Sequence, residues 1–580
     1  MTIALYGLRV SRGIAIGKAY IMARDDIEVR EYLIAVEAVE QEVARFSHAL
    51  DVAREQLQRV KQQIPHNTPV DIRSFIDTHL LMLDDTALAR VPIEIIRARH
   101  CNAEWALTLQ RDALVTVFEQ MEDAYLRTRR DDVDFVANRV LRILLNHSTH
   151  TDAAEGGKLK GAIVLADDIS PADIVLMQHQ GIAAFVTEYG GTNSHTAILA
   201  RSLGIPAIVG VHAVRRYLKN GELIIVDGRA GVLMASVDEM AIDHYRSRQR
   251  LEGLRVKALN RLRDAPAITR DGRKVALYAN VELVEDLAAI ERYGAEGIGL
   301  YRTEMLYLNR VTPPSEEEQY AAYSEVIGAA NGAPVTIRTV DIGSDKSTVW
   351  LHLTQGVVTN PALSLRGIRL CLHELPLFRS QLRAILRAAV HGQVRLMLPM
   401  LSNLQELTQV MQLVNEVKRE LTAAGVDYNR QVQIGGMIEV PAAAMIADLF
   451  ARHLDFLSIG TNDLIQYTLA ADRIDDAVNY LYDPLHPGVL RLIQMTIDAG
   501  NKAGIPVAMC GEMAGDLRYT RLLLGMGLTN FSMPAAFILE VKRRINESDY
   551  GQLRNQVASA LLSADATEIH ALVDSLNEDE

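Results

Sequence analysis

The sequence is poor in cysteine, in positive charge and in long apolar runs, and each shortage excludes a class of protein. Only three cysteines are present among 580 residues: Cys101, Cys371 and Cys510. They are too few and too far apart for a disulfide framework, which favours a reducing compartment, the cytoplasm. The spacing of Cys and His residues also shows no cluster of the kind that holds a structural metal.

The excess of acidic over basic residues excludes further functions. The formal net charge is −13, from 60 Lys and Arg against 73 Asp and Glu. This balance argues against nucleic-acid binding and mildly favours a basic partner. No apolar run is long enough to cross a bilayer, and the N-terminus lacks a signal-peptide pattern, so we expect no membrane insertion. The length allows three or more globular domains.

One stretch, Gly190–Arg201, carries the first chemical signal. It follows an apolar run at 182–187 that predicts a strand, and its two glycines allow a sharp turn. Thr192–Ser194 suit the cap of a helix, so His195 is expected near a helix N-terminus. Negative charge is favoured there, and an imidazole at that place can attack a phosphoryl group. The plainer interpretation is a polar histidine in a turn.

The second half of the chain predicts a barrel. From about residue 272, strand-like and helix-like runs alternate, and about eight such repeats over about 270 residues are the size of a (β/α)₈ barrel. The predicted strands are 275–279, 297–301, 335–340, 394–398, 434–438, 456–459, 507–510 and 530–533. A barrel of this kind carries its active site at the carboxyl ends of its strands.

Polar residues follow the apolar runs at those ends: Asn280, Arg302, Arg338, Glu439, Asp463 and Cys510. Two arginines suit a substrate with phosphate and carboxylate groups, which the guanidinium fork binds bidentately. Two carboxylates from neighbouring strands suit Mg²⁺. Each residue alone has a plainer interpretation, such as a salt bridge for an arginine or a small buried side chain for Cys510. Because all six residues follow apolar runs at the same ends of the predicted strands, a single site is favoured.

Two motifs resemble the signatures of phosphoenolpyruvate-utilising enzymes. The first is the Gly190–Arg201 block with its continuation through Gly210, and the second is Asp455–Leu464. Their order and the chain length resemble the enzyme I members of that family, the phosphoenolpyruvate–protein phosphotransferases of the bacterial phosphotransferase system.

The resemblance implies an α/β fold with five parts. A swivelling phosphohistidine α/β domain would comprise residues 1–24 and 147–235, interrupted by a helical bundle at 25–146. The bundle is also predicted by helical spacing of Val36, Val39, Val43 and Phe46. A linker helix at 236–268, a phosphoenolpyruvate-binding (β/α)₈ barrel of the TIM type at 269–550 and a C-terminal helical tail at 551–580 would follow.

The resemblance also implies an activity and a set of roles. His195 would take the phosphoryl group of phosphoenolpyruvate and pass it to the carrier protein HPr, while Cys510 protonates the enolate to give pyruvate. Glu439 and Asp463 would bind Mg²⁺. The substrate would be bound by Arg302, Arg338, Arg366, Asn462 and Arg473. The family forms homodimers through the barrel, so we expect one here.

The inserted bundle is the implied docking site for HPr. Asp71, Asp77, Asp84 and Asp85 are candidates for acidic contacts with a basic partner. A solvated helix face is an equally good interpretation of each.

Three residues depart from the family pattern. Ile174 stands where relatives often have a threonine that helps to hold the histidine, and Ser344 and Ser364 stand where relatives have glycine. Glycine at such places often permits close backbone approach.

Three alternatives remain open at this stage. One is an enzyme like phosphoenolpyruvate synthase or pyruvate phosphate dikinase, although no glycine-rich nucleotide loop is evident. Another is a regulatory phosphorelay enzyme that does not serve sugar uptake. A catalytically silent docking protein is the third, and the retention of every charged group argues against it.

Overall fold

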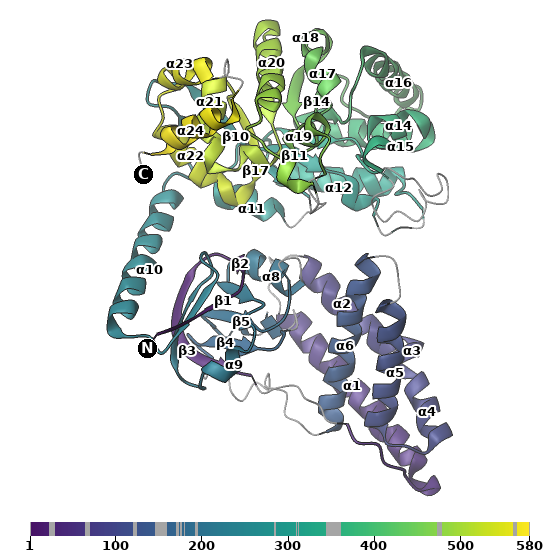
Figure 1. The fold of residues 1–580 in the computed structure, drawn as a ribbon. Coiled ribbons are helices and arrows are strands. Elements are labelled where there is room, and N and C mark those ends of the chain that lie inside the picture. Colours follow the sequence, from purple (N-terminus) through teal and green to yellow (C-terminus); the bar gives the residue numbers. More distant parts are fainter. Residues whose placement is uncertain are drawn as a thin grey trace. The chain divides into compact units, whose positions relative to one another are not determined.

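The computed structural model of the chain describes residues 2–22, 29–63, 70–119, 124–145, 159–169, 173–174, 177–178, 180–191, 195–282, 286–308, 310, 312–343, 361–472, 478–560 and 565–578. The chain divides into two compact units, Met1–Arg255 and Val256–Glu580 (Figure 1). Several predictions fall outside what the structure describes: the helix cap at 192–194, Ser344, Arg473 and the side chains of Asp71 and His195.

An eight-stranded sheet forms the centre of the first unit. Its strands are β1 Ile3–Tyr6, β2 Leu8–Ser11, β3 Ile14–Ile21, β4 Ile163–Ala166, β5 Ala184–Thr187, β6 Ala207–Val209, β7 Leu223–Asp227 and β8 Val232–Ala235. They are ordered β1-β8-β7-β3-β4-β5-β6-β2, and β3 to β6 are parallel neighbours. Every residue of β4 and β5 is buried, as is typical of parallel strands covered on both faces.

Successive residues of β4 contribute to two different cores, as the alternation of side chains along a strand requires. Ile163 and Leu165 join one core, whereas Val164 and Ala166 join a second. The second core also contains α8 His195–Leu203 and the inserted helices. The short helix α9 Val214–Tyr217 contributes Val214 to the first core.

The inserted segment is a helical bundle, as predicted. It contains the 3₁₀ turn η1 Val36–Ala38 and helices α1 Val39–Gln63, α2 Val70–Asp84, α3 Thr86–Ala89, α4 Val91–Arg99, α5 Ala103–Glu119 and α6 Ala124–Leu144 (Figure 1). Val39, Val43 and Phe46 are buried on one face of α1, in agreement with their spacing. Val36 does not continue that face, because it lies in η1 and is exposed.

A long helix, α10 Glu239–Asn260, runs across the boundary between the two units. Leu259 alone is buried among its residues. A helix that is polar on nearly all sides is typical of a connection between domains. Among the described helices, none combines the length and apolarity needed to span a membrane.

The second unit is a closed barrel of eight parallel strands. They are β10 Lys274–Val281, β11 Ile298–Arg302, β12 Val335–Arg338, β13 Val394–Leu398, β14 Gln433–Ile438, β15 Phe456–Ile459, β16 Val507–Met509 and β17 Asn530–Pro534. Each pairs in parallel with the next, and β10 pairs with both β11 and β17, which closes the ring. The short strand β9 Ala267–Ile268 adds to β10 in the antiparallel sense.

Helices surround this barrel and share its core (Figure 1). They are α11 Leu287–Tyr293, α12 Glu316–Ala329, α14 Ile368–His373, α15 Leu375–Ala388, α16 Leu404–Ala423, α17 Pro441–Met445, α18 Ala447–Phe450, α19 Thr461–Leu469, α20 Pro487–Ala503, α21 Leu517–Met526, α22 Ile538–Asn546, α23 Tyr550–Ala560 and α24 Ala566–Asn577. Short 3₁₀ turns occur at η4 Glu304–Leu306, η5 Pro361–Leu363, η6 Ala389–His391, η7 Asn479–Leu481, η8 Glu512–Ala514 and η9 Ala535–Phe537. The helical tail, α23 and α24, packs into the same core through Val557 and Val573.

Candidate active site at the carboxyl ends of the barrel strands

The barrel strands end at the polar residues that the sequence singled out. Arg302 is the last residue of β11 and Arg338 is the last residue of β12. Glu439 directly follows β14, Cys510 directly follows β16, and Asn280 is the penultimate residue of β10. Because the strands are parallel neighbours in one ring, all five residues lie at the same end of the barrel.

Asp463 reaches this end in a different way. β15 ends at Ile459, and Asp463 lies in the first turn of α19, where the helix dipole favours a carboxylate. Asn462 is beside it and is bonded to Glu512 in both directions. Its Nδ2 donates to Glu512 Oε1 at 3.1 Å, and its Oδ1 accepts from the Glu512 backbone N–H at 3.0 Å.

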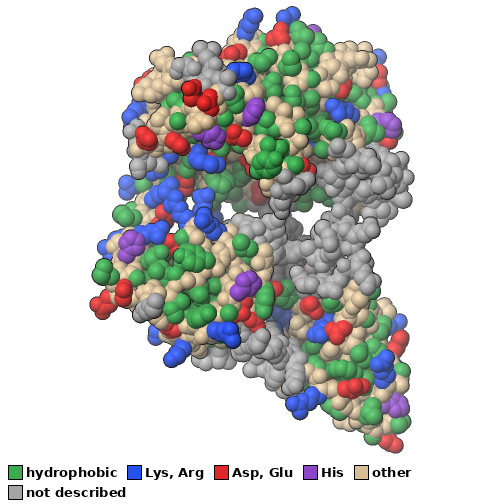
Figure 2. Space-filling model, viewed as in Figure 1, with side chains coloured by type: hydrophobic (Ala, Val, Ile, Leu, Met, Phe, Trp, Pro, Cys, Tyr) green, Lys and Arg blue, Asp and Glu red, His purple; other side chains and the backbone are tan. Residues whose placement is uncertain are grey.

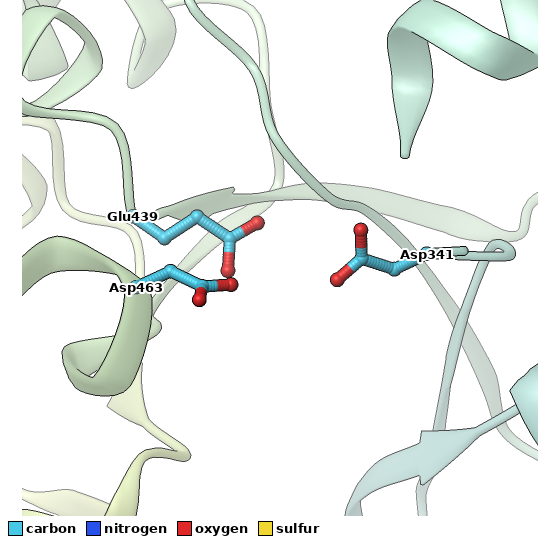
Figure 3. Close-up of side chains that lie close together, drawn as sticks. All are labelled: Asp341, Glu439 and Asp463. Carbon is cyan, nitrogen blue, oxygen red and sulfur yellow. The ribbon is translucent and has the colours of Figure 1, made fainter. Parts of the chain in front are cut away.

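Three carboxylates form an acidic cluster at this end of the barrel: Asp341, Glu439 and Asp463. One carboxylate oxygen of each lies within 4.8 Å of the others, so a single cation could contact all three. Figure 3 shows the carboxylates of Glu439 and Asp463 next to each other and facing that of Asp341. Glu439 and Asp341 are almost completely buried, at 1% and 2% exposure.

Electrostatics makes this cluster suitable for a divalent cation. Burial, reinforced by the negative charges of Asp463 and Asp341, raises the pKa of Glu439 from 4.5 to about 8. The backbone N–H of Met400 donates to Glu439 Oε1 at 2.6 Å and fixes its direction. A hard cation would relieve the repulsion and take these oxygens as ligands, so the residues present fit a bound Mg²⁺.

Two arginines balance the acidic cluster. Arg338 contacts Glu304 at 2.7 Å and Asp341 at 3.2 Å, and Arg366 contacts Asp341 at 2.9 Å and Asp463 at 3.1 Å. Burial works against the charge of each arginine, but the neighbouring carboxylates outweigh it and raise both pKa values. The arginines therefore stay charged at any ordinary pH.

Two arginine N–H groups in this region lack a hydrogen-bond partner in the described part of the chain. Nε of Arg338 and Nε of Arg302 are both buried, and neither has a hydrogen-bond partner among the described residues. Another atom of the same side chain, Nη1 of Arg302, forms an ion pair with Glu282. Buried donors are seldom left without a partner, so an anion bound here would complete their hydrogen bonding.

Cys510 lies beneath the charged groups, inside the barrel. It packs with Leu300, Met397, Met437 and Phe456 and is 4% exposed. Burial raises the pKa of its thiol, against a smaller opposing effect of a hydrogen bond from Ser458. The thiol therefore keeps its proton at neutral pH, as a proton donor must.

His195 lies in the other unit, as the first residue of α8. This confirms the predicted position at a helix N-terminus. The next residue, Thr196, is buried, and its hydroxyl donates to the carbonyl of Ile169 at 2.8 Å. Ile174 is fully buried in the second core of this unit, which explains why an apolar residue is tolerated there.

Sequence reasoning missed three residues of the barrel site: Asp341, Glu304 and Tyr467. Asp341 follows Arg338 by three positions at the same strand end, so the rule that found Arg338 could also have found it. Glu304 lies only two positions after Arg302, but nothing in the sequence alone indicated a role for it. Tyr467, whose hydroxyl accepts from Arg366 at 3.2 Å, has no sequence signal, because it lies on α19 one turn beyond Asp463.

Comparison with known proteins places these features in a family. Three models of phosphoenolpyruvate-utilising enzymes match the chain: the N-terminal region at residues 6–129, the mobile domain at 158–231 and the PEP-binding domain at 256–550. The chain is 45% identical over 575 residues to the phosphoenolpyruvate-protein phosphotransferase of Cupriavidus necator, covering 98% of each chain. It is 40% identical over 570 residues to that of Listeria monocytogenes, also covering 98% of each. A solution structure of an Enzyme I protein (nEIt) is 32% identical with a TM-score of 0.38, covering 43% of this chain and 99% of that one.

Proposed function

This chain belongs to the family of phosphoenolpyruvate-utilising enzymes and is a phosphotransferase that uses phosphoenolpyruvate; we propose that His195 takes the phosphoryl group and passes it to a carrier protein of the HPr type. Pyruvate is the other product. The observation that carries the proposal is the network of Arg338 and Arg366 with Asp341, Glu439 and Asp463 at one end of the barrel.

Substrate binding follows from the charges of this network. Phosphoenolpyruvate carries a phosphate and a carboxylate, and the buried guanidinium groups of Arg338 and Arg366 offer forks of matching geometry. The guanidinium group of Arg302 is a third donor group for the phosphate or the carboxylate. Glu439 and Asp463 would hold Mg²⁺, with Asp341 beside them. When bound, Mg²⁺ supplies positive charge that neutralises phosphate and enolate oxygens. By family resemblance, Asn462 and Arg473 also contact the substrate.

The first chemical step is phosphoryl transfer to His195. A ring nitrogen of His195 attacks phosphorus as the bond from phosphorus to the enol oxygen breaks, and the electron pair of that bond stays on the enolate. Little covalent help is needed, because such transfers depend on alignment and charge neutralisation. The position of His195 at the start of α8 favours the negative charge that the imidazole then carries.

The second step is protonation of the enolate. Cys510 donates its thiol proton to C3, which forms the methyl group of pyruvate and leaves a thiolate. Water afterwards returns the proton to sulfur. The raised pKa of this buried thiol supports the assignment, because it keeps the proton on sulfur until a strongly basic carbon is presented.

The inserted bundle is the proposed docking site for the carrier. Leu81 and Val117 are exposed at 69% and 52%, and hydrophobic, acidic and basic side chains are mixed over the visible face of the bundle (Figure 2). Asp77 pairs with Lys61 and Asp84 pairs with Arg54, while Asp85 caps α3. Surface pairs of this kind are weak, so a basic partner can compete for the first two carboxylates.

A homodimer through the barrel completes the proposal. Exposed apolar side chains on α17, η7 and α20 support it: Met445, Tyr480, Leu481 and Met495. Sedimentation of the purified chain tests this part alone.

Labelling experiments test the proposed function. ³²P-labelled phosphoenolpyruvate with Mg²⁺ should label the protein, and a purified HPr-type carrier should then remove the label. [γ-³²P]ATP should not label it; labelling from ATP would instead favour an enzyme like pyruvate phosphate dikinase. Arg338→Lys, which loses the guanidinium fork, should slow labelling at least about tenfold. Arg419→Lys, at an exposed position on α16, is the matched control and should not.

A further inference from the structure

Cys510 is held at three separate points by polar groups of strands β15 and β10. Its backbone N–H donates to the carbonyl of Ile459 at 3.1 Å, and its own carbonyl accepts from Asn280 Nδ2 at 3.1 Å. The sulfur accepts from the hydroxyl of Ser458 at 3.3 Å and lies 3.7 Å from the Ile459 carbonyl, to which the thiol can donate. Both the backbone and the side chain of Cys510 are therefore fixed.

Burial of the Ser458 hydroxyl at this position is unfavourable in free energy. Its contact with Cys510 is therefore poorly explained as incidental packing. Ser458 is 1% exposed, and the Cys510 side chain that it contacts packs with Leu300, Met397, Met437 and Phe456. Burying a hydroxyl among apolar side chains is unfavourable unless it forms a hydrogen bond. The bond from Ser458 to the Cys510 sulfur satisfies that need.

A second serine fixes the asparagine that holds the Cys510 carbonyl. The hydroxyl of Ser532 donates to Asn280 Oδ1 at 2.5 Å, so the amide of Asn280 must direct Nδ2 toward Cys510. Ser532 is fully buried. It fits because residue 299 is glycine: a Cβ there would lie 2.2 Å from the Ser532 hydroxyl oxygen.

We propose that Ser458 and Asn280 are positioning residues for the proton donor: Ser458 holds the sulfur of Cys510 and stabilises the thiolate left after proton transfer, and Asn280, oriented by Ser532, holds its backbone. This inference rests on the proposed role of Cys510. In the step itself the S–H bond breaks, a C–H bond forms at C3 of the enolate, and the S–H electron pair remains on sulfur. The Ser458 hydroxyl then donates to an anion, and hydrogen bonds to charged groups are stronger than those to neutral ones.

The reverse of this step isolates the proton transfer from the phosphoryl transfer. With Mg²⁺ and pyruvate in D₂O, the enzyme should exchange the methyl hydrogens of pyruvate for deuterium, which NMR measures directly. Ser458→Ala should slow this exchange about 10- to 100-fold, the range expected for losing one hydrogen bond to a charged group. Labelling of His195 from phosphoenolpyruvate in a single turnover should change less than about twofold, because no bond to phosphorus involves the thiol.

A metal-free measurement separates thiolate stabilisation from a general loss of structure. The pH profile of Cys510 alkylation, followed by mass spectrometry, should move to higher pH in Ser458→Ala, because the thiolate loses a donor. Asn280→Ala should slow exchange without moving the profile, since Asn280 contacts the carbonyl rather than the sulfur. Ser548→Ala is the matched control: Ser548 is a buried serine of the same unit whose hydroxyl donates to the Arg544 carbonyl at 2.7 Å. It should change neither quantity.

The outcomes distinguish this inference from the proposed function. If Cys510→Ala abolishes exchange while Ser458→Ala exchanges at the wild-type rate with an unmoved alkylation profile, the positioning role of Ser458 is wrong and the acid assignment stands. If Cys510→Ala itself exchanges normally, the acid assignment in the proposed function is wrong.

Discussion

Asp341 accepts two hydrogen bonds from the guanidinium of Arg366, one from Nη2 at 2.9 Å and one from Nε at 3.2 Å. The pair is buried, with side chains exposed by only 2% and 11%. The same Nη2 reaches Asp463 at 3.1 Å, so the arginine proposed to bind substrate and the carboxylate proposed to bind metal share one network. A change at either residue is therefore expected to affect both substrate and metal binding.

Replacement of Asp341 by asparagine tests that network. Asp341→Asn keeps the shape of the side chain but removes the charge that fixes Arg338 and Arg366. We expect the KM for phosphoenolpyruvate to rise about 10- to 100-fold, because charge-assisted hydrogen bonds that orient both forks are lost. Steady-state kinetics with a pyruvate-coupled assay measures this.

Asp448→Asn provides the matched control for that variant. Asp448, on α18, pairs with Arg452, and both side chains are more than half exposed, at 52% and 67%. An exposed pair contributes about 0–1 kcal/mol, so KM should not change. Equal effects of the two substitutions would contradict the organising role of Asp341.

The acidic cluster predicts a pH-dependent response to Mg²⁺. The pKa of Glu439 is raised from 4.5 to about 8 in the folded protein. A raised folded pKa means that the unfolded chain releases its proton first, so the metal-free protein loses stability as pH rises from about 4.5 to about 8. Mg²⁺ should therefore raise the melting temperature more at pH 8 than at pH 6, because it replaces the proton.

Two variants check that response. Glu439→Gln should remove both the pH dependence across this window and the extra effect of Mg²⁺ at pH 8. Glu416→Gln, at a partly exposed residue of α16, should leave both unchanged. A magnesium effect of the same size at both pH values in the wild-type protein would argue against the cluster as the site.

Cys510→Ala should separate the two chemical steps. Loss of the proposed proton donor should reduce the steady-state rate of pyruvate formation by at least about 100-fold, because a general acid usually contributes about 10²- to 10⁴-fold to a rate. Rapid-quench measurement of the first phosphorylation of His195 should show a much smaller change. Cys371→Ala removes another buried thiol of the barrel unit and is the control. Equal turnover in the two variants would count against Cys510.

The fold was predictable from the sequence because its signals are local and repeated. Eight apolar runs separated by helical segments gave the barrel, and the predicted strands 394–398 and 456–459 match β13 and β15 residue for residue. The position of His195 at the start of α8 also followed from local features, two glycines and a run of capping residues.

The site was only partly predictable, because contacts across the barrel have no local signal. Asp463 was expected at a strand end, but it reaches the cluster from α19, since the chain turns into a helix two residues earlier. Asp341 follows β12 closely enough to have been found by the strand-end rule, but its contact with Arg366 could not be predicted, because spacing along the chain does not show that β12 and the segment around Arg366 meet. The contact between Ser458 and Cys510, 52 residues apart, arises only when β15 and β16 pair.

The buried ammonium of Lys542 binds backbone carbonyls beyond the end of α10, and we expect these bonds to be needed for stability. This lysine is 2% exposed, and its ammonium donates to the carbonyls of Arg263 at 3.0 Å, Ala265 at 2.9 Å and Gly294 at 3.4 Å. Lys542→Met would leave these carbonyls without that donor and should lower the free energy of unfolding by about 2–4 kcal/mol.

Urea unfolding measures that loss, and Lys418→Met is the control. Lys418 also donates to one backbone carbonyl, that of Arg430 at 2.9 Å, but it lies in exposed surroundings. Its replacement should change the free energy of unfolding by less than about 0.5 kcal/mol. A loss of similar size in both variants would contradict the anchoring role of Lys542.

The central claim is that His195 carries the phosphoryl group, and labelling with ³²P-labelled phosphoenolpyruvate tests it most directly. The wild-type protein with Mg²⁺ should take up acid-labile, base-stable label, as should His212→Ala, a variant at another histidine of the same unit. His195→Ala should take up none. Acid-labile label of normal amount on His195→Ala would contradict the account.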